Sequence, residues 1–207
     1  MHSKKRCEMK RLFDFTVSLV LIIMLIPIFL IISIIIAIDA GNPVIYKQYR
    51  VGKDNKLFYI YKFRTMKNNT RLAATKDLTE ADSVITKSGR FLRKTSLDEL
   101  PQLFNVLKGD MSFVGPRPLI PEEKEIRILR KEYGIYSVRP GITGWAQVNG
   151  RDMLSDEEKA LFDKEYIDKQ SIAFDIKIMI KTVMVVLRHE NIAEGSEPDN
   201  RHNSGNA

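Results

Sequence analysis

The sequence has few of the residues that build covalent cross-links or histidine-based sites. Its single cysteine, Cys7, excludes a disulfide framework. Its three histidines, His2, His189 and His202, lie near the two ends of the chain, which argues against a histidine-based metal site. The apolar fraction of 44% excludes a wholly disordered chain, and 207 residues fit one domain with an appendage.

Acidic residues are outnumbered by basic ones. The chain has 33 Lys and Arg against 26 Asp and Glu, a net charge of +7. This balance suits an anionic partner, which composition leaves open between nucleic acid, anionic lipid and phosphorylated small molecules. No nucleic-acid-binding motif is present and the aromatic residues do not alternate with a basic stripe, so nucleic acid is not expected.

The most distinctive segment is a run of 24 residues without formal charge, residues 15–38, most of them Ile, Leu or Val. As an α-helix this run would be about 36 Å long, enough for a hydrocarbon core of about 30 Å. The run is longer than the apolar region of a signal peptide, and no small-x-small cleavage site follows it. The sequence therefore predicts a membrane segment that is retained.

Two features argue against a simple span. Pro27 lies near the centre of the run, where it removes one helical hydrogen bond and favours a kink. Basic residues flank the run on both sides, at Lys4, Lys5, Arg6, Lys10 and Arg11 before it and at Lys47, Arg50, Lys53, Lys56, Lys62 and Arg64 after it. The positive-inside rule asks for both flanks on the cytoplasmic face. A hairpin broken at Pro27 satisfies that rule, but the residues alone leave a kinked span open.

The rest of the chain predicts an α+β, mostly helical fold with a small β-hairpin element. A strand is expected over residues 57–65, a flexible loop over 67–87, and shaped Gly/Pro-rich loops over 109–118 and 139–150. Helical patterns cover residues 88–107, 121–133, 155–170 and 172–188. We divide the chain into a basic N-terminus with a membrane helix (1–40), a catalytic domain (41–190) and a disordered tail (191–207).

The helix predicted over residues 172–188 is strongly apolar and has Lys177 and Lys181 one turn apart. It fits a core helix whose two lysines extend to solvent, and it equally fits an amphipathic helix in the lipid headgroup layer.

The densest cluster of charged residues covers residues 90–110, with Asp98 and Glu99 adjacent and Arg93 upstream. In one interpretation Ser96 and Glu99 form a capping box, and the acidic residues only complement a helix dipole. In the other, Arg93 keeps Asp98 ionised by lowering its pKa. An ionised carboxylate is a nucleophile or a Mg²⁺ ligand.

Three arginines lie on stiff loops. Arg117 stands between Pro116 and Pro118, and Arg139 and Arg151 lie beside Gly and Pro residues. A guanidinium on a rigid backbone suits bidentate phosphate recognition, although each arginine alone also fits a turn paired to a surface carboxylate. Together with a carboxylate pair and a bilayer segment, they indicate phosphate chemistry at a membrane surface.

The motifs KTSLDELPQLFNVLKGDMSFVGPRPL (94–119), VRPGITGWAQVNGR (138–151) and YKFRTM (61–66) closely resemble the bacterial sugar transferases. These are the monotopic polyprenyl-phosphate phosphoglycosyl transferases, and the resemblance runs from about residue 5 to residue 188. The chain is similar to the minimal form of the family, without the additional amino-terminal segments of longer members. The resemblance implies a re-entrant helix broken at Pro27, although the family's serine before that proline is replaced here by Ile26.

The resemblance also implies an activity. The family moves a phospho-sugar from a UDP-sugar to polyprenyl (undecaprenyl) phosphate, releases UMP, requires Mg²⁺ and starts the assembly of capsule, O-antigen or glycoprotein glycans. Asp98 would be the nucleophile that forms an aspartyl phospho-sugar, and Glu99 its partner, either a base or a metal-positioning group. Both carboxylates would contact the metal. The phosphate-binding candidates are Arg93, Arg117, Arg151, Arg139 and Lys62.

The minimal size implies a donor with an N-acetylated amino sugar. The expected partners are the UDP-sugar, polyprenyl phosphate and membrane lipid, and a second copy of the chain or a later glycosyltransferase is left open. The expected location is monotopic on the bacterial inner membrane, with the catalytic domain on the cytoplasmic face. An alternative is a catalytically inactive membrane scaffold for glycan enzymes, against which the intact Asp98, Glu99 and Arg93 argue.

Overall fold

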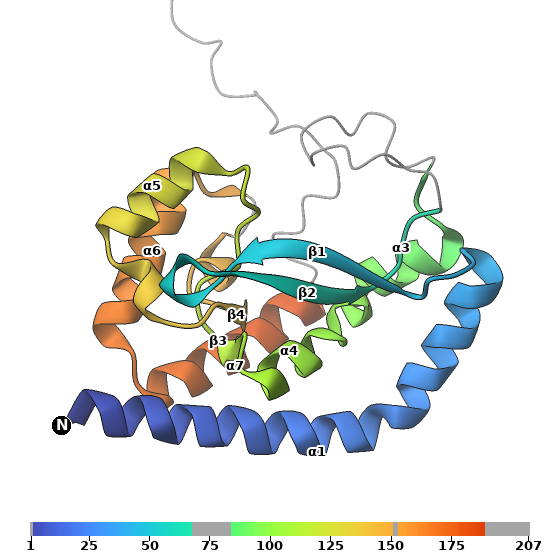
Figure 1. Cartoon of the computed structure of the whole chain (residues 1–207), viewed down its shortest axis with the longest axis horizontal. Coiled ribbons are helices and arrows are strands. Elements are labelled where there is room, and N and C mark those ends of the chain that lie inside the picture. Colours follow the sequence, from blue (N-terminus) through green and yellow to red (C-terminus); the bar gives the residue numbers. More distant parts are fainter. Residues whose placement is uncertain (1, 68–83, 151–152, 189–207) are drawn as a thin grey trace, which may run out of the picture.

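Helix α1 (His2–Asp39) contains the entire apolar run. The computed structural model of the chain describes residues 2–67, 84–150 and 153–188. Pro27 lies inside α1, and the helix bends in its second half as it passes from the bottom of the molecule to its right side (Figure 1). A missing hydrogen bond at a proline accounts for such a bend. Within the described residues, only Cys7–Asp39 is helical, long and apolar enough to cross a membrane.

Strands β1 (Ile45–Val51) and β2 (Leu57–Phe63) form an antiparallel hairpin that lies across the middle of the molecule (Figure 1). Their register pairs Ile45 with Phe63 and Val51 with Leu57. A 3₁₀ turn, η1 (Lys53–Asn55), joins the two strands. The strand predicted over residues 57–65 is confirmed, and Ile60 and Phe63 on it are buried.

The helical stretch predicted over residues 88–107 is confirmed in part, because the structure divides it into three pieces. The structure has α3 (Lys87–Lys94), the 3₁₀ turn η3 (Leu97–Glu99) and α4 (Gln102–Lys108). Ser96 interrupts the helical path because its φ of 55° is left-handed, and Pro101 precedes α4. The break allows η3 to present its side chains in a direction that a continuous helix would not.

The two loops predicted from their Gly and Pro residues, 109–118 and 139–150, contain a parallel pair of three-residue strands. These are β3 (Ser112–Val114) and β4 (Gly141–Thr143). The two chain segments approach very closely: a Cβ added at Gly141 would lie 2.1 Å from the backbone nitrogen of Gly115. Only glycine fits at position 141, so Gly141 allows the two loops to approach this closely.

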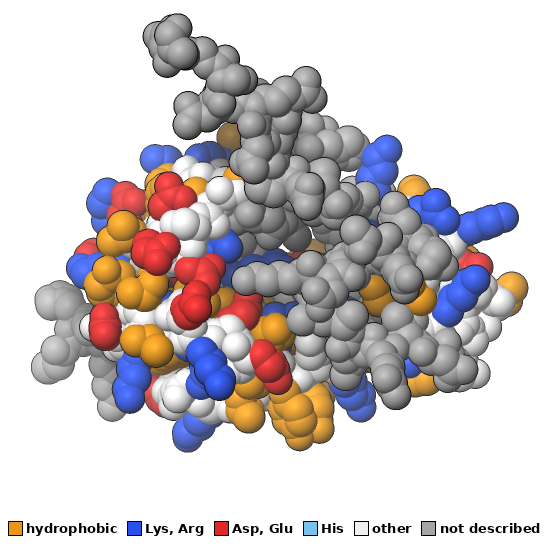
Figure 2. Space-filling view, turned by 90° about the horizontal axis from the view of Figure 1, so that it is seen from above, with side chains coloured by type: hydrophobic (Ala, Val, Ile, Leu, Met, Phe, Trp, Pro, Cys, Tyr) orange, Lys and Arg blue, Asp and Glu red, His pale blue; other side chains and the backbone are white. Residues whose placement is uncertain are grey.

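The three helices predicted in the second half of the chain are confirmed. They are α5 (Lys124–Glu132), α6 (Asp156–Lys169) and α7 (Ile172–Arg188). Helix α6 begins with a capping box between Ser155 and Glu158. Helices α5 and α6 lie together at one end of the molecule and α3 at the other (Figure 1). Seen from above, side chains of both charge signs lie over α5 and α6, whereas those near α3 are mostly basic (Figure 2).

The core is built where α1 and α7 meet the rest of the chain. Ile32 and Ile36 of α1 are buried with Phe63 and Leu92, and Ile178 of α7 is buried with Val114 and Tyr166. The opposite side of α7 presents a stripe of exposed apolar residues: Ile172, Ile176, Ile180, Val183 and Met184. Helix α7 therefore has a core face and a second apolar face that the described residues leave uncovered.

Some predictions lie outside the described residues. These are most of the loop over residues 67–87, Arg151 and the tail from residue 191. The division of the chain at residue 40 stays a prediction.

Candidate active site

The Asp98–Glu99 pair is presented by the turn between α3 and α4. The Thr86 side chain caps α3 by accepting a hydrogen bond from the Gly89 amide at 3.0 Å. A Cβ on Gly89 would lie 2.2 Å from the carbonyl oxygen of Thr65, which follows β2. This close approach attaches the start of α3 to the end of the hairpin, so that η3 packs beside β2.

The capping box expected at Ser96 and Glu99 is wrong. Ser96 is left-handed and makes no side-chain capping bond. The Glu99 carboxylate instead forms an ion pair with Lys62 of β2, with 2.7 Å between Oε1 and Nζ. The Glu99 side chain is therefore oriented by the hairpin and not by a helix N-terminus.

The Asp98 carboxyl is buried, with 9% of the residue exposed. Burial raises the pKa of Asp98, the neighbouring Glu99 adds to the rise, and the charges of Lys62 and Arg93 oppose it. The lowered pKa expected from Arg93 is wrong, because desolvation outweighs the two cations. The Arg93 guanidinium is held in place by a 3.0 Å hydrogen bond from Nε to the Thr65 hydroxyl.

A small open recess lies beside this pair, between the hairpin, α4 and the two Gly/Pro loops. Its lining residues are Arg50, Ile60, Lys62, Glu99, Gln102, Arg117, Pro118, Gly141 and Ile142. Three predicted site residues, Lys62, Glu99 and Arg117, therefore meet at one place although they come from distant parts of the sequence. A recess with one carboxylate and three cations is suited to a phosphate group.

Arg50 is a recess residue that the sequence indicated only as one of many basic flanking residues. Its guanidinium donates to the Pro118 carbonyl at 3.2 Å and to Gln48 Oε1 at 2.7 Å. Its Nε is buried and has no hydrogen-bond partner among the described residues. Burial and the charge of Arg117 lower the pKa of Arg50. Arg50 and Arg117 thus place two like charges at one recess, an arrangement that a bound anion would stabilise.

Arg139 does not lie at this recess. Its Nε donates to the Gly109 carbonyl at 2.8 Å, at the C-terminal end of α4. Arg11 donates to the carbonyls of Val106 and Leu107 at the same helix end, at 2.6 and 2.7 Å. The two guanidiniums thus satisfy terminal carbonyl groups of α4 and connect this helix to α1. Arg139 and Arg11 line a separate hollow with Phe15.

The carboxylates present are compatible with Mg²⁺ bound together with a substrate. Within the described part of the chain, no three His, Cys, Asp or Glu side chains are arranged to hold a metal by themselves. Mg²⁺ is commonly bound by one or two carboxylates together with substrate phosphates and water. Adjacent Asp98 and Glu99 meet that requirement at a recess suited to phosphate.

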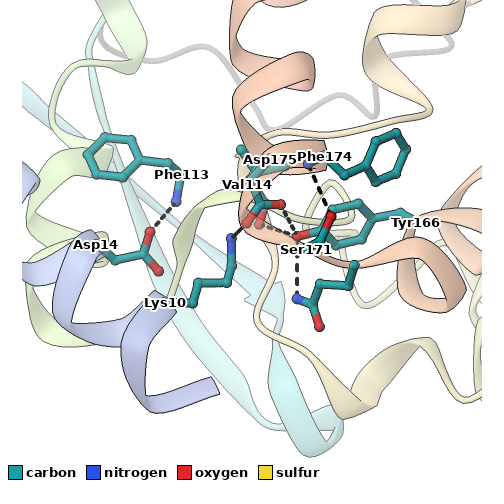
Figure 3. Close-up of polar contacts among 9 residues, drawn as sticks. Lys10, Asp14, Phe113, Val114, Tyr166, Ser171, Phe174 and Asp175 are labelled. Atoms are coloured by element: carbon teal, nitrogen blue, oxygen red, sulfur yellow. Dashed lines mark hydrogen bonds and ion pairs between the residues drawn. The ribbon is translucent and has the colours of Figure 1, made fainter. Parts of the chain in front are cut away.

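A second polar cluster connects α1 and α7 to β3 (Figure 3). Lys10 and Asp175 form an ion pair at 2.5 Å. The buried Tyr166 hydroxyl lies 2.8 Å from Asp175 Oδ1 and 3.1 Å from the carbonyl oxygen of Val114. Asp14 of α1 accepts a hydrogen bond at 3.3 Å from the backbone amide of Phe113, which precedes Val114 on β3. Strand β3 is therefore linked to α1 twice, directly through Asp14 and through Tyr166, Asp175 and Lys10.

Comparisons with known proteins agree with the motifs. The model of the family described as "Bacterial sugar transferase" matches residues 5–189. The chain is 43% identical over 186 residues to the "Uncharacterized sugar transferase EpsL" of Bacillus subtilis (strain 168), covering 90% of this chain and 91% of that protein.

Several relatives have names that include a reaction, among them the following two. The chain is 42% identical over 182 residues to the "UDP-glucose:undecaprenyl-phosphate glucose-1-phosphate transferase" of Escherichia coli (strain K12), covering 84% of this chain and 39% of that protein. It is 41% identical over 197 residues to the "Undecaprenyl-phosphate galactose phosphotransferase" of Salmonella typhimurium (strain LT2), covering 88% of this chain and 41% of that protein. The chain thus spans about two fifths of the length of these two relatives.

Proposed function

The chain belongs to the bacterial sugar transferase family, and from this premise we propose that it transfers a sugar 1-phosphate from a UDP-sugar to a polyprenyl phosphate, with release of UMP. The observation that carries the proposal is the buried Asp98 carboxyl beside a recess lined by Arg50, Lys62 and Arg117. The lipid-linked product would start the assembly of a surface polysaccharide. The names of the Escherichia coli and Salmonella typhimurium relatives support this class of donor and acceptor.

The first chemical step uses Asp98 as the nucleophile. Its ionised carboxylate attacks the β-phosphorus of the UDP-sugar, and a new bond forms between an aspartyl oxygen and phosphorus. The bond from that phosphorus to the bridging oxygen breaks, and UMP leaves with the electron pair. Arg50 and Arg117 bind the charged phosphate oxygens, and the ion pair with Lys62 keeps Glu99 in place beside the nucleophile.

The second step returns Asp98 to its free form. A phosphate oxygen of the polyprenyl phosphate attacks the same phosphorus, and the aspartyl–phosphorus bond breaks. The product is a polyprenyl-diphosphate-linked sugar. Asp98 and Glu99 are the residues that would hold Mg²⁺, which when bound neutralises negative charge on the diphosphate and the leaving UMP. Two displacements let donor and acceptor use one small recess in turn.

The identity of the sugar is a separate part of the proposal. An N-acetylated amino sugar is one candidate, whereas the names of the Escherichia coli and Salmonella typhimurium relatives include glucose and galactose. A donor panel that contains UDP-glucose, UDP-galactose, UDP-N-acetylglucosamine and UDP-N-acetylgalactosamine distinguishes these alternatives.

We also propose that α1 enters and leaves the bilayer on the cytoplasmic face. Near its start, Lys10 and Asp14 contact α7 and β3, and near its end Ile32, Ile36 and Asp39 contact the hairpin and α3. The middle of the helix carries exposed apolar residues that include Leu19, Val20, Ile23, Met24, Ile26, Ile28 and Leu30. A straight span would separate the two ends by the thickness of the membrane, so contacts of both ends with one body support the re-entrant path.

The exposed apolar stripe of α7 also supports a position of the protein at the membrane surface. Lys177 and Lys181 lie 5.7 and 5.1 Å from the centre of the Trp145 ring, on the protein side of the stripe. A helix with an exposed apolar face and lysines beside it is typical of one that lies in the headgroup layer. Together, α1 and α7 would hold the recess at the level of the acceptor's phosphate.

The activity is tested by UMP release from the full chain in detergent, with Mg²⁺, undecaprenyl phosphate and the donor panel. We expect release with one class of donor, and about one equivalent of UMP per enzyme when the acceptor is omitted. Asp98→Asn should abolish both signals, whereas Asp168→Asn, which removes an exposed carboxylate on α6, should leave them unchanged. Absence of UMP from a folded wild-type chain with every donor would contradict the proposal and favour the inactive scaffold.

The topology is tested with the chain's own thiol. Cys7 is exposed and is the sole cysteine, so a membrane-impermeant maleimide reports the side on which the N-terminus lies. A Cys7→Ser, Lys94→Cys variant reports the side of the catalytic domain. Labelling of both positions from the same face of inverted vesicles is expected, and labelling from opposite faces would show a true span.

A further inference from the structure

The loop that presents Arg117 to the recess has its carbonyl groups satisfied one after another. Each carbonyl from residue 116 to residue 121 accepts a hydrogen bond: Pro116 from the Gly141 amide, Arg117 from Arg130, Pro118 from Arg50, Leu119 from the Val51 amide, Ile120 from the Glu123 amide and Pro121 from Arg127. Three of these donors are arginine side chains. A loop bonded at every carbonyl is held in one conformation far more firmly than a surface turn requires.

Arg130 is the donor that acts at Arg117 itself. It lies on α5, and its Nη1 donates to the Arg117 carbonyl oxygen at 2.7 Å. Its Nη2 forms an ion pair at 2.5 Å with Asp163 Oδ2 on α6. The Arg130 side chain is 4% exposed and that of Asp163 is 1% exposed. One planar guanidinium therefore connects two helices to the backbone of the predicted phosphate-binding arginine.

Stability is a weak explanation for this buried ion pair. Taking two charges out of water costs several kcal/mol per ion, and well-packed apolar residues of similar volume are often as stable. Burial raises the pKa of Asp163, and the charge of Arg130 opposes that rise. Helices α5 and α6 pack against each other, and Ile126 of α5 and Ala160 of α6 are almost fully buried. An apolar pair would suit this position, so a role at the recess is the better explanation.

Arg117 needs such support because its neighbour at the recess is Arg50, which has the same charge. Without a bound anion, the two guanidiniums repel each other. Pro118 confines the Arg117 backbone to the extended region, which still leaves a range of directions for the Arg117 carbonyl. The bond from Arg130 does fix it, and with it the direction from which the Arg117 side chain leaves the loop.

We propose that Arg130 and Asp163 are positioning residues that hold Arg117 beside Arg50, ready for the phosphate groups of the donor. This inference rests on the proposed function. Asp163 orients the guanidinium of Arg130, Arg130 fixes the carbonyl of Arg117, and Arg117 binds the phosphate. Neither Arg130 nor Asp163 lines the recess, so their effect is transmitted through the loop.

The test is a cycle of variants assayed with the donor that supports UMP release. Arg130→Met combined with Asp163→Leu removes both buried charges together and leaves neither unpaired. We expect this double variant to stay folded and to raise the KM for the donor about 10- to 100-fold, with a smaller change in kcat. In an Arg117→Ala background, the same double substitution should change kcat/KM less than about threefold, because the residue it positions is gone.

Arg130→Lys is a second, milder variant. It keeps a positive charge opposite Asp163 but lacks the fork that reaches the Arg117 carbonyl at the same time. We expect this variant to have a melting temperature within a few degrees of the wild-type value and a raised KM for the donor. The matched control is Lys164→Gln with Asp168→Asn, which removes an exposed ion pair from the same helix as Asp163. This control should have wild-type kinetics.

Two results would overturn the inference. One is wild-type kcat/KM for folded Arg130→Lys or for the folded double variant. The other is an equal loss in the wild-type and Arg117→Ala backgrounds, which would show that the ion pair acts independently of Arg117. A smaller folded fraction alone would lower kcat without changing KM, so the two parameters separate positioning from stability. Absence of UMP release from the wild-type chain would instead count against the proposed function.

Discussion

Replacement of Asp98 by asparagine is expected to have opposite effects on activity and stability. Asparagine has nearly the same shape, but it neither ionises nor attacks phosphorus. If Asp98 is the nucleophile, kcat should fall by about 10⁴-fold or more, the scale seen when a catalytic nucleophile is removed. The same change removes a buried charge whose pKa is raised by burial, so the folded state should become more stable at neutral pH.

The sign and size of the stability effect follow from linkage. A raised pKa means that the folded chain binds a proton at Asp98 more tightly than the unfolded chain does. The resulting stabilisation is fully present below the unfolded pKa and is lost as the pH rises through the folded pKa. Each unit between the two values corresponds to about 1.4 kcal/mol. In a chain of this size, each kcal/mol changes the melting temperature by about 2–4 °C.

The assay compares the melting temperatures of wild type and Asp98→Asn in one detergent from pH 4 to pH 8. The difference in favour of the variant should grow with pH and then level off above the folded pKa of Asp98. Asp168→Asn, at an exposed site on α6, provides the control for loss of a carboxylate. A variant that is less stable than wild type at pH 8, or a difference that shrinks as the pH rises, would refute the reasoning from burial.

Three further outcomes are expected. Lys62→Met removes the charge that most strongly opposes the raised pKa of Asp98. The acidic limb of the pH profile of kcat/KM should therefore move to higher pH, and an unmoved limb would contradict this electrostatic role. Gly141→Ala places a Cβ 2.1 Å from the Gly115 nitrogen and should destabilise the chain by on the order of 3 kcal/mol or more, measured by denaturant unfolding; a stable variant would contradict the close approach of the two loops. Pro27→Leu should straighten α1 and expose Cys7 to maleimide on the opposite membrane face, and unchanged labelling would show that Pro27 does not decide the path.

The elements that the sequence predicted well are those with a long local pattern. Helices α5, α6 and α7 begin and end within three residues of the expected bounds, because each is a long stretch of uniform character, charged in α5 and α6 and strongly apolar in α7. The β2 strand was found from its alternation of aromatic and polar residues. By contrast, β3 and β4 have three residues each, which is too short for any period, and their pairing joins segments almost 30 residues apart.

The site was predicted less completely because its properties depend on contacts between distant segments. The pattern of Ser96 and Glu99 is that of a capping box, but Glu99 finds a partner 37 residues away in Lys62. The pKa of Asp98 depends on burial, which no local spacing reports. Arg50 reaches the recess through a bond to a residue 68 positions later in the chain. Nothing near Arg50 in the sequence distinguishes it from the other basic residues that follow the apolar run.

The position of β3 explains why a short strand matters in this fold. On one side, Phe113 and Val114 are bonded to Asp14 and to the Tyr166 hydroxyl, and through Asp175 to Lys10 of α1 (Figure 3). On the other side, the chain continues within three residues into the loop that carries the recess arginine. A shift of α1 relative to the catalytic domain would have to break these buried bonds or move the loop with it. In the proposed arrangement, the same strand therefore links the depth of α1 in the bilayer to the height of the recess, as a reaction with a lipid-bound phosphate would require.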